Sequence, residues 1–135
     1  MNRPTVLPNL LKDYINCFRR TAELYRLLSR SAPNEREQRM LDGFSHECQQ
    51  TAEELSGSYR AMTGYISENE PVQIKETGSY RSVIRGRIGA ETGLSRQLRE
   101  VYMDTNNYRL KRIFFTAYHE AFERSLILME MLLNS

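Results

Sequence analysis

Residues 84–102 read IRGRIGAETGLSRQLREVY, and this stretch decides the fold because it sets a glutamate into an apolar helical stripe. At about 100° per residue its apolar side chains fall on one face of a helix, with Glu91 at the centre of that face. Carboxylates are rarely buried unless a cation or a metal ion compensates their charge. The stretch therefore predicts a core helix that carries a polar site. The apolar members of the face are Tyr80, Ile84, Ile88, Leu94, Leu98 and Tyr102.

Glycine, proline and asparagine residues divide the chain into four long segments with helical periodicity. We expect helices over about 8–29, 33–62, 79–104 and 108–133, with Pro33 in the first turn of the second helix. The first and third connections are short, which predicts two helical hairpins, and the longer segment 65–78 joins them. The expected fold is all-α, an antiparallel four-helix bundle formed by a single domain over residues 1–135.

Composition narrows the class of protein. Apolar residues make up 40% of the 135 residues and charged residues 27%, as in soluble globular domains. The net charge of +2 is too small to indicate nucleic acid or an anionic membrane as a partner. No apolar run reaches the length of a membrane span, and residues 1–11 lack the pattern of a signal peptide. Cys17 and Cys48 fall on apolar helix faces, so we expect reduced thiols and a cytoplasmic protein.

The fourth expected helix also carries charge inside its core-facing stripe. Glu120 and Arg124 lie within the stripe and Glu123 lies on its edge. In the third helix, Arg87 lies one turn before Glu91 on nearly the same side. Carboxylates on facing helices of a bundle are the usual ligands of a di-metal centre, and arginines beside them are the usual partners of buried ion pairs.

A second apolar stripe runs along the opposite face of the fourth helix. A helix that is apolar on two faces is buried on both, and a four-helix bundle covers only one of them. We therefore expect a homodimer that packs through this stripe, the alternative being a cover formed by the N-terminal arm or by the 65–78 connection. The stripe consists of Phe115, Tyr118, Phe122, Leu126, Met129 and Leu133.

These features resemble the ferritin-like superfamily, in particular its small rubrerythrin-like bundles. The matching stretches are Thr51-Ala52 through Met62-Thr63-Gly64, Gly89-Ala90-Glu91, and His119-Glu120-Ala121-Phe122-Glu123. The resemblance covers nearly the whole chain from Pro8 and implies two hairpins joined by a crossover. It also implies a di-iron centre in which the first and third helices each supply a glutamate, and the second and fourth each supply a Glu-x-x-His pair.

Several of the implied ligand positions hold other residues in this chain. Glu91 and Glu120 stand where the family has glutamate. Phe18 and Cys48 replace the other two glutamates, and both histidines are replaced. The residues at the histidine positions are Thr51 and Glu123.

Three interpretations of the polar residues remain open. In the first, Glu91, Glu120 and Glu123, with or without Cys48, bind a cation such as iron or manganese, because carboxylate oxygens suit hard ions. In the second, Arg87 and Arg124 take the place of the metal as bidentate partners of Glu91 and Glu120. In the third, the arginines extend to solvent and the glutamates are hydrated.

We favour the second interpretation, which predicts a non-catalytic protein with a structural or interaction role and without a cofactor. The alternative is a metal-binding ferritin-like protein, either a rubrerythrin-like oxidoreductase or a metal-handling protein. The motifs of nucleotide-binding loops and of serine or cysteine hydrolases do not occur in the sequence.

Overall fold

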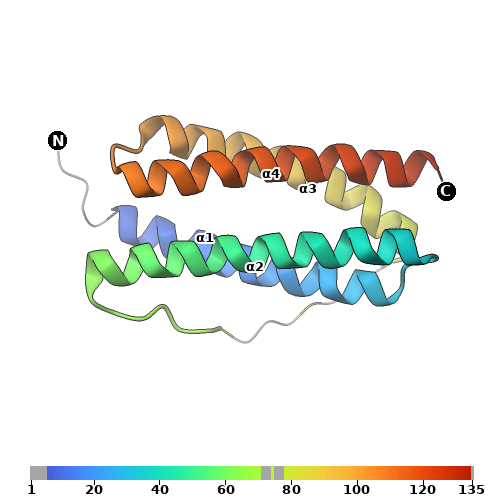
Figure 1. Cartoon of the computed structure of the whole chain (residues 1–135), viewed down its shortest axis with the longest axis horizontal. Helices are drawn as coiled ribbons and strands as arrows, with labels where there is room; N and C mark the ends of the chain where they lie inside the picture. The colour runs from blue at the N-terminus through green and yellow to red at the C-terminus, as the bar shows by residue number, and fades with distance from the viewer. Residues whose placement is uncertain (1–5, 71–73, 75–77, 135) are drawn as a thin grey trace.

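The computed structural model describes residues 6–70, 74 and 78–134. This part of the chain contains four α-helices (Figure 1). The all-helical prediction is confirmed, and the described residues contain no strand. Each helix matches an expected segment to within a few residues. The helices are α1 (Val6–Arg30), α2 (Glu35–Thr63), α3 (Tyr80–Asp104) and α4 (Tyr108–Leu133).

Polar caps fix both ends of α2. The Asn34 side chain accepts a hydrogen bond from the backbone N–H of Glu37 (2.9 Å), and its amide donates to the Glu37 carboxylate (2.9 Å). Because Asn34 is the N-cap, Pro33 precedes the helix instead of lying in its first turn as expected. Gly64 ends the helix in the left-handed region (φ 77°), where glycine carries no steric penalty, and donates to the Arg60 carbonyl at 2.8 Å.

Side-chain caps also begin α3 and α4. Ser79 accepts from the Ser82 backbone N–H (3.2 Å), and Asn107 accepts from the Leu110 N–H (3.0 Å). Only residues 105–107 separate the two helices, so α4 turns back directly along α3.

The helices associate as two hairpins, α1 with α2 and α3 with α4 (Figure 1). In Figure 1, α1 and α4 run from left to right and α2 and α3 run from right to left. Buried serines link the two helices of each hairpin: Ser45 donates to the Ala22 carbonyl at 2.8 Å and Ser95 to the Tyr118 carbonyl at 3.0 Å. Small side chains at these positions satisfy their own hydroxyls and leave room for the neighbouring backbone.

A core of large side chains fills the space between the hairpins. Phe18, Tyr25 and Leu55 from the first hairpin and Leu98 and Phe114 from the second are fully buried. Within residues 6–70 and 78–134, none of the helices combines the length and the apolar content that a bilayer span requires.

The described start of the long connection lies against the first hairpin. Arg19 of α1 donates to the Glu68 carbonyl at 3.0 Å and to the Ser56 hydroxyl at 3.2 Å. Residues 65–70 are thereby held on the α1/α2 side of the molecule, away from the outer face of α4 (Figure 1). The N-terminal arm that we considered as another cover lies, through residue 5, outside the described residues.

Candidate functional site

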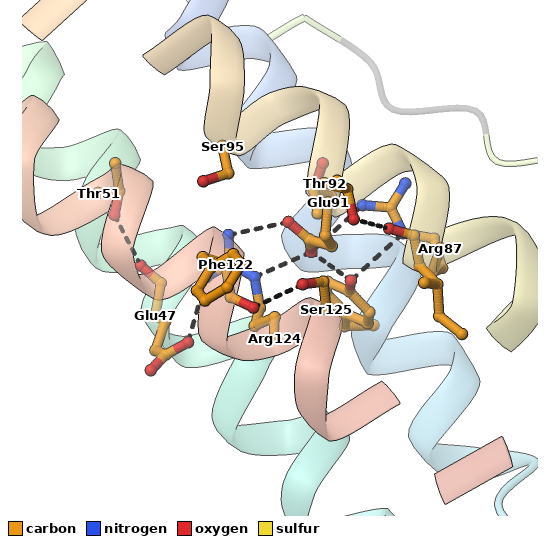
Figure 2. Close-up of polar contacts among 12 residues, drawn as sticks. Glu47, Thr51, Arg87, Glu91, Thr92, Ser95, Phe122, Arg124 and Ser125 are labelled. Carbon is orange, nitrogen blue, oxygen red and sulfur yellow. Dashed lines mark hydrogen bonds and ion pairs between the residues drawn. The ribbon is translucent and has the colours of Figure 1, made fainter. Parts of the chain in front are cut away.

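The centre of the bundle holds a bidentate pair between Glu91 of α3 and Arg124 of α4 (Figure 2). The Arg124 Nε donates to Glu91 Oε2 at 2.9 Å, and Nη2 donates to Oε1 at 3.2 Å. The side chain of Glu91 is 0% exposed and that of Arg124 is 2% exposed. The planar guanidinium matches both carboxylate oxygens, a geometry that a lysine cannot reproduce.

Two further side chains complete the surroundings of the Glu91 carboxylate. The Tyr25 hydroxyl of α1 donates to Glu91 Oε2. Arg87, one turn before Glu91, approaches the same oxygen with Nη2 at 3.4 Å and donates from Nε to the Tyr25 hydroxyl at 3.3 Å. Its guanidinium also lies over the Tyr25 ring, 5.2 Å from the ring centroid. Glu91 thus receives hydrogen bonds from two arginines and a tyrosine.

Arg124 has a second carboxylate partner on α2. Its Nη1 donates to Glu47 Oε1 at 3.1 Å, so that the guanidinium lies between Glu47 and Glu91 (Figure 2). All three guanidinium nitrogens are therefore hydrogen-bonded. Glu47 is 35% exposed, so this end of the network reaches solvent, whereas Glu91 does not.

Together these five residues form what we call the central cluster: Tyr25, Glu47, Arg87, Glu91 and Arg124. Every helix contributes to it, and its two carboxylates balance its two guanidiniums. Such a cluster adds little net stability relative to an apolar core, because desolvation offsets the attraction. Its members are nevertheless interdependent, since loss of one leaves a buried partner uncompensated. The cluster joins the two hairpins, because Glu91 and Arg124 of the second contact Tyr25 and Glu47 of the first.

Burial and charge change the protonation behaviour of the cluster. Burial lowers the pKa of a guanidinium, but the neighbouring Cys48 thiol and Glu91 carboxylate hold the pKa of Arg124 above its ordinary value. The pKa of Tyr25 is raised, first by burial and then by the Glu91 charge. Arg124 therefore stays cationic and Tyr25 stays a hydrogen-bond donor over the physiological pH range.

The three predicted metal ligands are not brought together. Glu91 uses both oxygens on Arg124, Glu120 is half-buried, and Glu123 is exposed. Within the described residues no three histidine, cysteine or acidic side chains form a group that could hold a metal ion. Glu120 forms no hydrogen bond or ion pair with another described residue. Burial and the nearby Glu47 charge raise its pKa to about 7.

The other positions implied by the family resemblance are buried in the core. Phe18 and Cys48 are fully buried, and Thr51 is buried with its hydroxyl donating to the Glu47 carbonyl at 3.1 Å. Burial raises the pKa of the Cys48 thiol to about 12. That side of the core presents an aromatic ring, a neutral thiol and a satisfied hydroxyl, which are poor ligands for iron or manganese.

Sequence reasoning missed two members of the cluster. Helical periodicity places Tyr25 on the inward face of the first helix and Glu47 on the flank of the second, and neither position indicates a polar contact. We expected Glu120 as the second carboxylate because it lies one turn from Arg124. The structure has Glu47 in that role, because Arg124 extends between α2 and α3. No sequence signal singles out Glu47, because Glu91 and Glu120 already balance the two arginines in the predicted stripes.

Comparison with known proteins gives no match for this chain: no family model, curated protein or solved structure matches it.

Proposed function

We propose that this chain is a non-catalytic bundle of ferritin-like arrangement, in which the central cluster occupies the place of the family's di-metal centre. Its role is structural, or it is that of an interaction module that binds a partner. The helix order supports the ferritin-like arrangement, since two hairpins are joined by a long connection and the second and third helices run in the same direction (Figure 1). Glu91 and Arg124 lie at or beside positions where the family resemblance implies ligands.

The observation that carries this proposal is the saturation of Arg124. Its guanidinium donates to Glu91 through two nitrogens and to Glu47 through the third, while the side chain is 2% exposed. A cation that approached Glu91 would have to displace a buried positive charge that already satisfies both carboxylate oxygens. Coulomb repulsion and the loss of three hydrogen bonds both oppose that exchange.

We also propose a homodimer and a cytoplasmic location. The apolar outer stripe of α4 supports a homodimer, because most of its large side chains are exposed in the single chain. The free thiols of Cys17 and Cys48 support a cytoplasmic location, where thiols stay reduced.

One observation favours a second candidate, a metal-binding protein with iron or manganese at Glu91, Glu120 and Glu123. The Glu120 carboxyl is half-buried, and burial together with the charges of Glu47, Glu54 and Glu123 raises its pKa to about 7 against the opposing charge of Arg124. A bound cation would relieve this repulsion.

Titration with Mn²⁺ and anaerobic Fe²⁺ separates the two candidates. We expect the wild-type protein to show no saturable heat of binding and no rise in melting temperature with either ion. Saturable binding that is lost in Glu91→Gln would overturn the proposal and support the metal-binding candidate. Glu35→Gln, which changes an exposed carboxylate at the start of α2, is the matched control.

A further inference from the structure

The outer face of α4 carries an uncovered apolar surface. Five of the six residues in the predicted stripe are between 39% and 84% exposed, and only Tyr118 is partly buried. We call this surface the α4 stripe; its members are Phe115, Tyr118, Phe122, Leu126, Met129 and Leu133. An apolar row of this length on a single chain is typical of a contact with another molecule.

The two edges of the α4 stripe carry opposite charge. On the α3 side, Arg81 donates to the Leu132 carbonyl at 3.2 Å, and the Tyr102 ring packs on Phe115 with centroids 5.4 Å apart. These contacts place the outer face of α3 beside the stripe. That face presents three exposed arginines, Arg85, Arg96 and Arg99.

The opposite edge lies toward α2 and is acidic along the C-terminal half of α4. Glu123 and Glu130 are exposed there, two helical turns apart. Glu130 contacts Arg36 of α2 at 2.8 Å through one carboxylate oxygen, which fixes the side of α4 on which this edge lies. The α4 stripe is therefore bordered by a basic edge on α3 and an acidic edge on the α2 side.

A second copy can cover the α4 stripe with either of two symmetry axes. When the two-fold axis runs along α4, the copies pack in parallel and each basic edge faces the acidic edge of the other. When the axis runs across α4, the copies pack antiparallel and like edges face each other. Like charges across an interface oppose association, so charge complementarity favours the parallel arrangement.

We propose that two copies associate through the α4 stripe in parallel, with Arg85 facing the partner's Glu130. This inference rests on the homodimer in the proposed function and adds its orientation and its charge contacts. It commits to a second copy as the occupant because the same surface supplies the apolar stripe and both complementary edges.

The register of the second hairpin supports this pairing. Arg81 bonds to Leu132 and Ser95 bonds to Tyr118, so one residue further along α3 corresponds to one residue back along α4. Arg85 is therefore level with Leu128 along the helix axis. In the parallel dimer the two copies of α4 are level residue by residue, so the partner's Glu130 lies about 3 Å further along the axis, at about 1.5 Å per residue. In the antiparallel alternative, Arg85 would lie within about 5 Å along the axis of the partner's Arg96.

A charge exchange tests the pairing by sedimentation equilibrium. Arg85→Glu and Glu130→Arg should each raise the dimer dissociation constant about tenfold, because two symmetry-related ion pairs become repulsive. The double variant should return the constant to near the wild-type value. Arg39→Glu, which reverses an exposed charge on α2, should leave it unchanged. A dimer that both single variants weaken and the double variant fails to restore overturns the parallel pairing.

Disulfide cross-linking tests the orientation independently. In the parallel dimer, Met129 faces the partner's Met129, so Met129→Cys should form a disulfide-linked dimer on mild oxidation. The wild-type chain, which keeps Cys17 and Cys48, is the control and should stay uncrosslinked. A dimer without this cross-link overturns the parallel orientation and leaves the homodimer standing. A monomer overturns both proposals, and a monomer that sediments with phosphatidylserine vesicles would assign the α4 stripe to a lipid surface instead.

Discussion

Replacement of Arg124 by methionine removes the central cation and keeps most of the side-chain volume. The methionine fills the space of the arginine stem, so that little of the effect comes from a cavity. What remains is the Glu91 carboxylate, 0% exposed, without its two guanidinium hydrogen bonds. Glu47, at 35% exposed, can turn to water and should contribute little.

The loss in the free energy of unfolding depends on the side chains that still surround Glu91 in the variant. Removal of one member of a buried ion pair costs roughly 3–5 kcal/mol in the free energy of unfolding. Tyr25 and Arg87 still contact the carboxylate in the variant, and Arg87 keeps a positive charge within 3.4 Å. We therefore expect Arg124→Met to lose about 3 kcal/mol, the lower end of that range. Adding Glu91→Gln removes the uncompensated charge and should recover about 1–3 kcal/mol relative to the sum of the two single variants.

Urea unfolding followed by circular dichroism measures these differences at one protein concentration, which keeps the contribution of self-association comparable. The matched control is Arg36→Met, because Arg36 and Glu130 form the same kind of α2–α4 ion pair with side chains 54% and 55% exposed. The control should lose less than about 1 kcal/mol. If Arg124→Met costs no more than the control, or if its effect adds independently to that of Glu91→Gln, the reasoning about the central cluster is refuted.

Three further outcomes are expected. Tyr25→Phe should cost roughly 1–3 kcal/mol in the same urea assay, because Glu91 loses a buried donor; an unchanged midpoint would contradict the hydrogen bond. Burial and the Glu47 charge raise the pKa of Glu120 from 4.5 to about 7, so folding favours its protonated form. The wild-type protein should therefore lose stability relative to Glu120→Gln as the pH rises from 5 to 8. Parallel pH profiles of the two proteins would show that Glu120 is hydrated. Burial raises the pKa of both Cys17 and Cys48, so a thiol reagent at pH 8 should react slowly with the native protein and rapidly after unfolding. Rapid reaction of both thiols in the native protein would contradict their burial.

The helices were predictable because their signals are local. Hydrophobic periodicity, Gly64 at the end of α2 and the polar residues Ser79 and Asn107 before α3 and α4 depend on neighbours within one or two turns. The start of α2 was displaced by two residues because Asn34, rather than Pro33, satisfies the first free N–H groups.

The central cluster was only partly predictable because its contacts join distant segments. Periodicity identified Glu91 and Arg124 as charged residues on core-facing stripes, but it does not say toward which neighbouring helix a long side chain extends. Arg124 reaches α3 and α2 at once, and so it meets Glu47, 77 positions away in sequence, rather than Glu120 one turn away. The hydrogen bond of the Tyr25 hydroxyl could not be predicted from the sequence, because a tyrosine in an apolar stripe is usually interpreted as a packing residue.

The metal content of the protein as isolated from cells tests the central claim most directly. Cells would be grown in medium supplemented with iron and manganese, and the purified protein would be examined by elemental analysis together with circular dichroism. A cluster in which Arg124 holds the place of the metal predicts a folded protein with no transition metal above the level found in the control Glu91→Gln, which lacks the buried carboxylate. A stoichiometric transition metal in the wild-type protein, absent from Glu91→Gln, would contradict it.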